Sequence, residues 1–118
     1  MSAGQAESPP EIFSHGDEGE WVDVAPGNRR RVMLHTDELM MVAFAFEKGG
    51  IGASHSHPHV QASYVASGRF EVTVGERTDT LSAGDGFIVP SGTVHGVIAL
   101  EDGMLIDSFT PQRADFLK

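Results

Sequence analysis

The sequence predicts an all-β protein, a sandwich or small barrel built from short strands. Two observations favour this class. Eight or more strand-like runs follow one another along the 118 residues, and glycine-containing turns separate them. One run, residues 69–74, alternates apolar with polar side chains, which is the period of a half-buried strand. No long helical period and no internal repeat interrupts this pattern.

The chain length allows one domain with one core. Residues 1–10 are small, polar and proline-containing, so we expect a flexible tail, with residues 11–118 as a single domain. Residues 49–52, Gly-Gly-Ile-Gly, are expected to form a flexible turn, and residues 111–118 have room for one short helix. The other expected strands span residues 21–24, 30–35, 39–46, 61–67, 87–89, 94–100 and 104–109.

The run at residues 39–46 differs from the others because it is apolar on both faces. A strand of this kind usually lies between the core and a second covering surface. That surface is either a second copy of the chain in a homodimer or the N-terminal segment of the same chain.

Composition and charge exclude several classes of site and partner. The chain has no cysteine, so neither a disulfide framework nor a thiolate metal site is possible. The first twenty residues lack a secretory signal, and the longest apolar run is too short to span a bilayer, so we expect a cytoplasmic protein. The net charge of −9 disfavours nucleic acid and anionic membranes as partners. We expect the only basic cluster, Arg29-Arg30-Arg31, to be an exposed strand edge or a set of intersubunit ion pairs rather than an anion site.

Four side chains with uncharged donor atoms have the spacing of a divalent metal site. His55 and His57 are one residue apart, so both imidazoles can point to the same face of an extended segment. Gln61 adds an amide oxygen, and His95 follows a Pro-x-Gly turn on a separate strand. Neutral ligands would leave a bound ion its full positive charge, which makes it a Lewis acid and attracts an anionic substrate. The alternative for His55 and His57 is an exposed polar pair in a loop.

Two motifs around these residues resemble those of the cupin superfamily. The first is Gly49-x5-His55-x-His57-x3-Gln61-x6-Gly68, and the second is Gly84-x5-Pro90-x-Gly92-x2-His95-x3-Ala99. The resemblance implies an antiparallel jelly-roll barrel, also called a double-stranded β-helix, with a metal ion in its mouth. The chain departs from the general cupin pattern at Gln61, where glutamate is usual, and at Ala99, where asparagine is frequent.

Residues 55–61 and 106–117 are similar to a narrower group, the small KdgF-type cupins of pectin degradation. That resemblance implies a ring-opening enzyme that converts 4,5-unsaturated monouronates from pectin or alginate into a linear 5-keto sugar acid. It also implies that His55, His57, Gln61 and His95 are the metal ligands, and it makes glutamine the expected ligand at position 61. Imidazole and amide donors fit nickel, zinc, manganese, iron or copper, so the pattern does not name the metal.

The same resemblance implies working residues near the C-terminus, at Asp107, Phe109 and Arg113. Asp107 would be the general acid or base, Arg113 would hold the substrate carboxylate through two parallel hydrogen bonds, and Phe109 would form a wall of the pocket. Strand parity alone leaves open whether Asp107 faces the interior or water. Two other functions remain as alternatives: a metal-dependent dioxygenase, and a cupin that binds a uronate without turnover.

Overall fold

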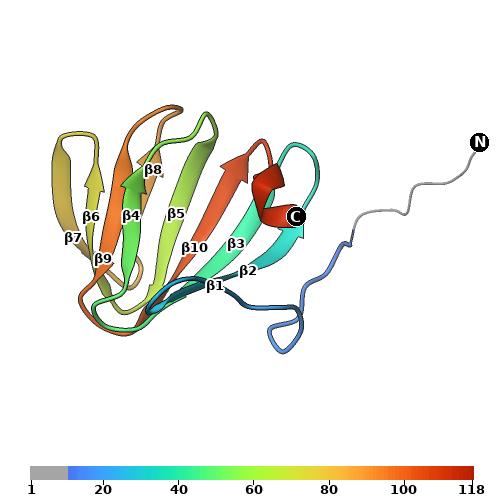
Figure 1. Ribbon diagram of the computed structural model, residues 1–118, viewed down its shortest axis with the longest axis horizontal. Helices are drawn as coiled ribbons and strands as arrows, with labels where there is room; N and C mark the ends of the chain where they lie inside the picture. The colour runs from blue at the N-terminus through green and yellow to red at the C-terminus, as the bar shows by residue number, and fades with distance from the viewer. Residues whose placement is uncertain (1–10) are drawn as a thin grey trace, which may run out of the picture.

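The structure is a computed structural model that describes residues 11–118, and it confirms the all-β prediction (Figure 1). The expected flexible tail, residues 1–10, lies outside the described residues. Within them a single short 3-10 helix, η1 (Ala114–Leu117), follows the last strand. The strands are β1 (Val22–Ala25), β2 (Asn28–His35), β3 (Met40–Phe46), β4 (Ile51–His55), β5 (Val60–Ser67), β6 (Arg69–Val74), β7 (Arg77–Ser82), β8 (Gly86–Val89), β9 (His95–Ala99) and β10 (Gly103–Thr110).

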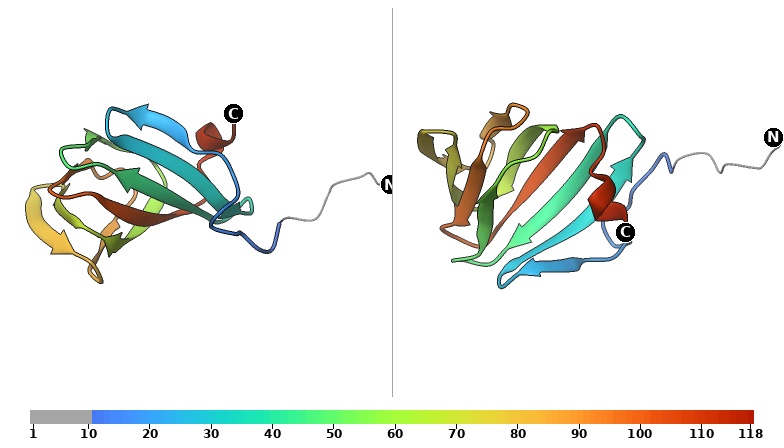
Figure 2. Two further views of the ribbon diagram at one scale, coloured as in Figure 1. Left: turned by 90° about the horizontal axis from the view of Figure 1, so that it is seen from below. Right: turned by 45° about the horizontal axis from the view of Figure 1, so that its top comes forward.

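The strands form two antiparallel sheets that face each other (Figures 1 and 2). The larger sheet has the order β1-β2-β3-β10-β5-β8, and the smaller has the order β4-β9-β6-β7. The last strand, β10, lies between β3 and β5 in the larger sheet. This placement puts the C-terminal residues beside strands from the first half of the chain, and η1 lies over β2 and β3 (Figure 2).

Two of the strands were not expected from the sequence. β4 begins at Ile51, where the glycine-rich residues predicted a turn, because Ile51 and Gly52 pair with Ile98 and Val97 of β9. β7 has no apolar alternation, since five of its six residues are exposed at the edge of the smaller sheet. Such an edge strand buries almost nothing, so hydrophobic periodicity cannot reveal it.

Apolar side chains fill the space between the sheets in two clusters. The larger cluster includes Phe46 of β3 and Phe70 of β6, whose rings meet edge-on with centroids 5.2 Å apart. Burying one such ring stabilises the fold by roughly 1.5–3 kcal/mol. The smaller cluster is formed by Met40, Val42 and Phe109. The two clusters therefore pack the inner face of β3 near both of its ends, at Met40 and at Phe46.

The outer face of the larger sheet explains why residues 39–46 are apolar on both sides. Arg31 of β2 is only 7% exposed, and its Nη1 donates a hydrogen bond to the carbonyl of Glu18 at 3.0 Å. Its neighbour on β3, Ala43, is 2% exposed. The N-terminal segment therefore covers part of this face, as one of the two alternatives predicted. Met41 on the same face is still 37% exposed.

Among the described residues, no helix is long and apolar enough to cross a membrane.

Candidate metal centre

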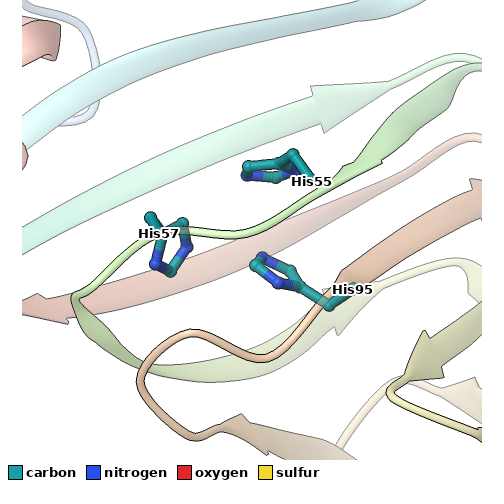
Figure 3. A group of neighbouring side chains, drawn as sticks. All are labelled: His55, His57 and His95. Carbon is teal, nitrogen blue, oxygen red and sulfur yellow. The ribbon is translucent and has the colours of Figure 1, made fainter.

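Three histidines come together where the end of β4 and the segment after it meet the start of β9 (Figure 3). His55 ends β4 and pairs directly with His95, which begins β9. His57 follows β4 by two residues, and its ring lies 4.8 Å from that of His95. Nitrogen atoms from all three rings lie within 4.8 Å of one another. The structure therefore gathers the three histidines that the sequence assigned to a metal.

The turn before His95 is tied to the segment that carries His57. Gly92 has a φ of +77°, a conformation that glycine adopts without the steric cost of a side chain. Its N–H donates a hydrogen bond to the carbonyl of His57 at 2.8 Å. The glycine of the second motif thus helps to fix the distance between the two histidine-bearing segments.

Backbone carbonyl groups orient all three rings in the same way. A carbonyl oxygen can only accept a hydrogen bond, so the Nδ1 atom that contacts it must carry the proton. The Nε2 atom of each neutral ring is then left with a free lone pair, which is the form that binds metals. The Nδ1 partners are the carbonyls of Ala53 for His55 at 2.8 Å, His59 for His57 at 3.1 Å and Thr93 for His95 at 2.9 Å.

Burial keeps two of these rings in the neutral form. Removal from water lowers the pKa of His57 and also lowers the pKa of His95, because a charged imidazolium is poorly solvated there. Hydrogen bonds to Gln61 and to backbone carbonyls act in the opposite direction but do not reverse these effects. Both rings are therefore prepared to bind a cation without first losing a proton.

Gln61 joins the histidine cluster through its amide oxygen. Its Oε1 lies 3.0 Å from Nε2 of His57, while its Nε2 donates to Oγ of Ser63 at 3.0 Å and to Oδ2 of Asp107 at 3.3 Å. With the Nδ1 atom of His57 protonated, two lone pairs face each other across that 3.0 Å contact. A shared cation would relieve this opposition, so the donor set fits a bound metal ion of the type the sequence predicted.

The register of β5 and β10 places Asp107 beside this cluster. Asp107 pairs with Ser63, and Phe109 pairs with Gln61, all on the inner face of the larger sheet. Asp107 is 6% exposed, and within the described residues its Oδ1 has no hydrogen-bond partner. The structure thereby decides what strand parity left open, because the carboxyl faces the interior.

Burial dominates the chemistry of Asp107. Desolvation raises its pKa from 3.8 to about 7, although Ser63 and Arg113 act to lower it. A carboxyl with a pKa near neutrality can both accept and release a proton at physiological pH, which suits proton transfer.

Arg113 reaches the same cavity but already holds a carboxylate. Its Nε and Nη2 donate to the two oxygens of Asp115 at 3.1 and 2.9 Å. The guanidinium is stacked 4.3 Å from the ring centre of Phe116, and its side chain is only 12% exposed. The bidentate geometry predicted for Arg113 is therefore present, with a residue of the same chain in place of a ligand.

A cavity of about 400 Å³ connects these groups between the two sheets. Sequence reasoning missed four of the residues at this site: Asn28 and Arg30 of β2, together with Asp115 and Phe116 of η1. The only available signal was the alternation of side chains along β2, which places Asn28 and Arg30 on the same face of that strand. The predicted residues that line the cavity are His55, Gln61, His95, Asp107, Phe109 and Arg113.

Comparison with known proteins identifies the family. The cupin domain family matches residues 42–106. The chain is also 44% identical over 103 residues to the pectin degradation protein KdgF of Dickeya dadantii (strain 3937), which covers 86% of this chain and 94% of that protein. The chain belongs to the KdgF family of cupins. The resemblance of the two motifs to cupins and the narrower resemblance of residues 55–61 and 106–117 to the KdgF group are both confirmed.

Solved structures of related cupins have the same fold over nearly the whole chain. KdgF from Halomonas sp. superposes with a TM-score of 0.86 at 42% identity, covering 90% of this cupin and 98% of that chain. An RmlC-like cupin from Shewanella frigidimarina NCIMB 400 gives a TM-score of 0.87 at 42% identity, covering 90% and 96%. The jelly-roll architecture is therefore shown by sequence and by structure.

Proposed function

We propose that this cupin opens the ring of 4,5-unsaturated monouronates released from pectin or alginate, giving a linear 5-keto sugar acid. The observation that carries the proposal is the hydrogen bond from Gln61 to Asp107, which joins the histidine cluster to a buried carboxyl suited to proton transfer. The 44% identity to a pectin degradation protein supports a uronate as the substrate class.

We propose one divalent transition metal ion, bound by His55, His57, Gln61 and His95. Nickel, zinc, manganese, iron and copper all accept such nitrogen and oxygen donors. When bound, the ion would supply Lewis acidity that favours negative charge developing on a substrate oxygen. His55, His57 and His95 would hold the ion through their Nε2 atoms, and Gln61 would hold it through its amide oxygen. Ring opening itself requires no oxidation or reduction.

Asp107 would carry the proton that the reaction moves. The substrate is a hemiacetal at C1 and an enol ether between C4 and C5. Asp107 takes the proton from the C1 hydroxyl, a carbonyl forms at C1, and the bond from C1 to the ring oxygen breaks. The ring oxygen then belongs to an enolate, and delivery of the proton to C4 leaves a ketone at C5. Oδ1 is the available oxygen for this transfer, because Oδ2 accepts a hydrogen bond from Gln61.

Two further side chains would hold the substrate during this transfer. Arg113 would orient its carboxylate, either by exchanging it for Asp115 or through the N–H groups that Asp115 does not use. Phe109 is 1% exposed and lines the cavity, so it would form an apolar wall beneath the sugar ring.

We also propose that two copies of this cupin form a homodimer through the outer face of the larger sheet. Besides Met41, this face presents Tyr64 and Ile88, which are 52% and 58% exposed. Pairing of β5 with β8 places Ala62 opposite Ile88, so these side chains share one side of the sheet. Exposed apolar side chains grouped in this way are typical of protein interfaces.

One experiment separates the proposed reaction from its alternatives. The metal-loaded protein is mixed with monouronate freshly produced by a pectate or alginate lyase, and the products are followed by NMR. We expect rapid loss of the vinyl signal at C4 and appearance of the linear 5-keto acid. Oxygen consumption would instead indicate a dioxygenase. An unchanged rate of ring opening relative to a protein-free control would contradict the enzymatic proposal and favour a binding cupin.

A further inference from the structure

Arg30 of β2 lines the cavity without an acceptor for its hydrogen-bonding groups among residues 11–118. The sequence predicted that Arg29-Arg30-Arg31 form an exposed strand edge or a set of intersubunit ion pairs, but the structure separates the three arginines. Arg29 is exposed and lies over the ring of Trp21, Arg31 is covered by the N-terminal segment, and Arg30 points inward. A guanidinium has five N–H donors, so Arg30 offers the cavity both a positive charge and several free donors.

Two arginines line the cavity, and Arg30 is the one without an ion-pair partner within the described part of the chain. Arg113 forms an ion pair with Asp115 at 2.9 Å, whereas Arg30 has none among residues 11–118. Burial also lowers the pKa of Arg30, and nearby Arg113 adds to this, whereas Asp115 raises it. A guanidinium starts from so high a pKa that it remains charged at neutral pH. Arg30 is therefore a cavity cation that forms no ion pair with a carboxylate of the described residues.

Asn28 provides a second polar group on the same strand and the same face. It is 4% exposed, and its Nδ2 donates to the carbonyl of Ile51 at 3.2 Å. This bond assigns the other terminal atom as oxygen, and that Oδ1 has no partner among the described residues. A buried acceptor without a donor costs free energy unless a ligand or water supplies one. A hydroxyl beside an anionic group would satisfy Asn28 and Arg30 together.

We propose that Arg30 binds the carboxylate of an anionic sugar in this cavity and shares it with Arg113. The two guanidinium groups lie 4.0 and 4.3 Å from the centre of the same Phe116 ring, so they are neighbours at one end of the cavity. Asp115 accepts two hydrogen bonds from the Arg113 guanidinium, whereas the Arg30 guanidinium has no acceptor among residues 11–118. This inference rests on the proposed function for the choice of a uronate, and it adds a specificity-determining residue that the sequence motifs do not contain.

The test compares Arg30→Gln with Arg29→Gln, which removes the same charge from the outer face of the same strand. With the unsaturated monouronate as substrate, we expect Arg30→Gln to raise KM about 10- to 100-fold, the usual effect of losing a hydrogen bond to a charged group. The value of kcat and the metal content should change much less. Arg29→Gln should behave as the wild type. An unaltered KM for Arg30→Gln would overturn the proposal.

Binding without turnover keeps this result separate from the proposed reaction. Calorimetric titration with D-galacturonate and with its neutral counterpart D-galactose measures what the carboxylate contributes. We expect the wild type to prefer galacturonate and Arg30→Gln to lose that preference. If Arg30 only packs against Phe116, both proteins would retain the preference, which would contradict the inference even in an active enzyme. A wild type that binds galacturonate no better than galactose would also overturn it.

A second variant covers the possibility that Arg30→Gln does not fold. Arg30→Lys keeps the aliphatic stem and the charge but loses the planar fork that matches a carboxylate. We expect about 3- to 10-fold weaker galacturonate binding for this variant, because a single ammonium replaces two parallel hydrogen bonds. Wild-type affinity in a folded Arg30→Lys variant would show that the fork of Arg30 is not used.

Discussion

At the scale of single residues, this site depends on one buried carboxyl beside a cluster of neutral donors. Asp107 lies in a mostly apolar cavity, and its neighbour Gln61 presents its amide N–H to the carboxyl and its oxygen to His57. One glutamine side chain therefore contacts both parts of the site. A glutamate at this position could not do so, since it would place a second acceptor against Asp107.

The first prediction concerns proton transfer by Asp107. Asp107→Asn preserves the shape of the side chain and can still contact Gln61, but it cannot accept the proton of the C1 hydroxyl. We expect kcat for ring opening to fall by about 10²–10⁴, the usual contribution of a positioned acid or base. Metal content by elemental analysis should stay at the wild-type level, and loss of the metal would mean that Asp107 acts through the metal centre instead.

The second prediction concerns the metal ligands. His95→Ala removes one of the three free Nε2 atoms, so the protein should lose most of its bound metal after dialysis against a weak chelator. His35→Ala is a matched control, because His35 lies outside the cluster and its Nδ1 contacts Gln112. Elemental analysis of both variants provides the measurement. Full metal occupancy in His95→Ala would exclude His95 from the ligand set.

The third prediction follows from the raised pKa of Asp107. In the metal-free protein its pKa is about 7 when folded, against 3.8 for an exposed carboxyl. A raised pKa contributes stability that is complete below the lower value and is lost as pH rises through the higher one. Asp107→Asn should therefore gain stability over the wild type between about pH 4 and about pH 8, by about 1.4 kcal/mol for each pH unit that separates the two pKa values. Urea denaturation at both ends of this pH range measures the gain, and a difference that stays constant with pH would contradict the raised pKa.

At the scale of structural elements, η1 closes one end of the cavity with a single aromatic side chain. Phe116 meets the rings of Phe109 and Phe44 edge-on, with centroids 5.8 and 6.3 Å away, and it lies under both cavity arginines. The segment before η1 is held by Gln112, whose carbonyl contacts the Nε2 atom of His59 at 3.1 Å. Phe116 thus links β3, β10 and the two guanidinium groups in one stack.

The fourth prediction tests this element. Phe116→Ala removes the surface on which Arg30 and Arg113 are stacked, so both should become mobile and KM should rise. We expect unfolding stability to fall by about 1–3 kcal/mol, below the roughly 3–5 kcal/mol of a fully buried phenylalanine because Phe116 is only half-buried. Leu117→Ala in the same element is the control, since Leu117 is 42% exposed. Equal KM values for the two variants would mean that the stack does not position the arginines.

At the scale of the whole molecule, the two faces of the larger sheet have separate roles. The inner face carries Asp107 and the cavity. The outer face is covered near Arg31 by the N-terminal segment and leaves Tyr64 and Ile88 exposed. The two faces are therefore independent surfaces, and a partner on the outer one does not obstruct the cavity.

The fifth prediction addresses this outer face. Light scattering should give twice the 12.6 kDa mass of one chain for the wild type. Tyr64→Arg would bury an unpaired charge in the interface and should lower the mass to that of a monomer. Val94→Arg, at an exposed site outside the larger sheet, is the control and should remain dimeric. A monomeric wild type would contradict the homodimer.

The strand-rich fold, the cupin motifs and the grouping of the three histidines could all be predicted from the amino-acid sequence. These features are local: alternation over a few residues, glycines at turns, and donor atoms at fixed spacing. The sequence did not predict β4 and β7, because a glycine-rich strand and an exposed edge strand lack hydrophobic alternation. The directions in which Asp107 and Arg30 point could be read only from the folded protein. Sheet register between β5 and β10 turns Asp107 toward Gln61, and pairing of β2 with β3 places Arg30 beside Phe44 on the inner face. Both outcomes depend on contacts between segments far apart in the chain, which no local pattern records.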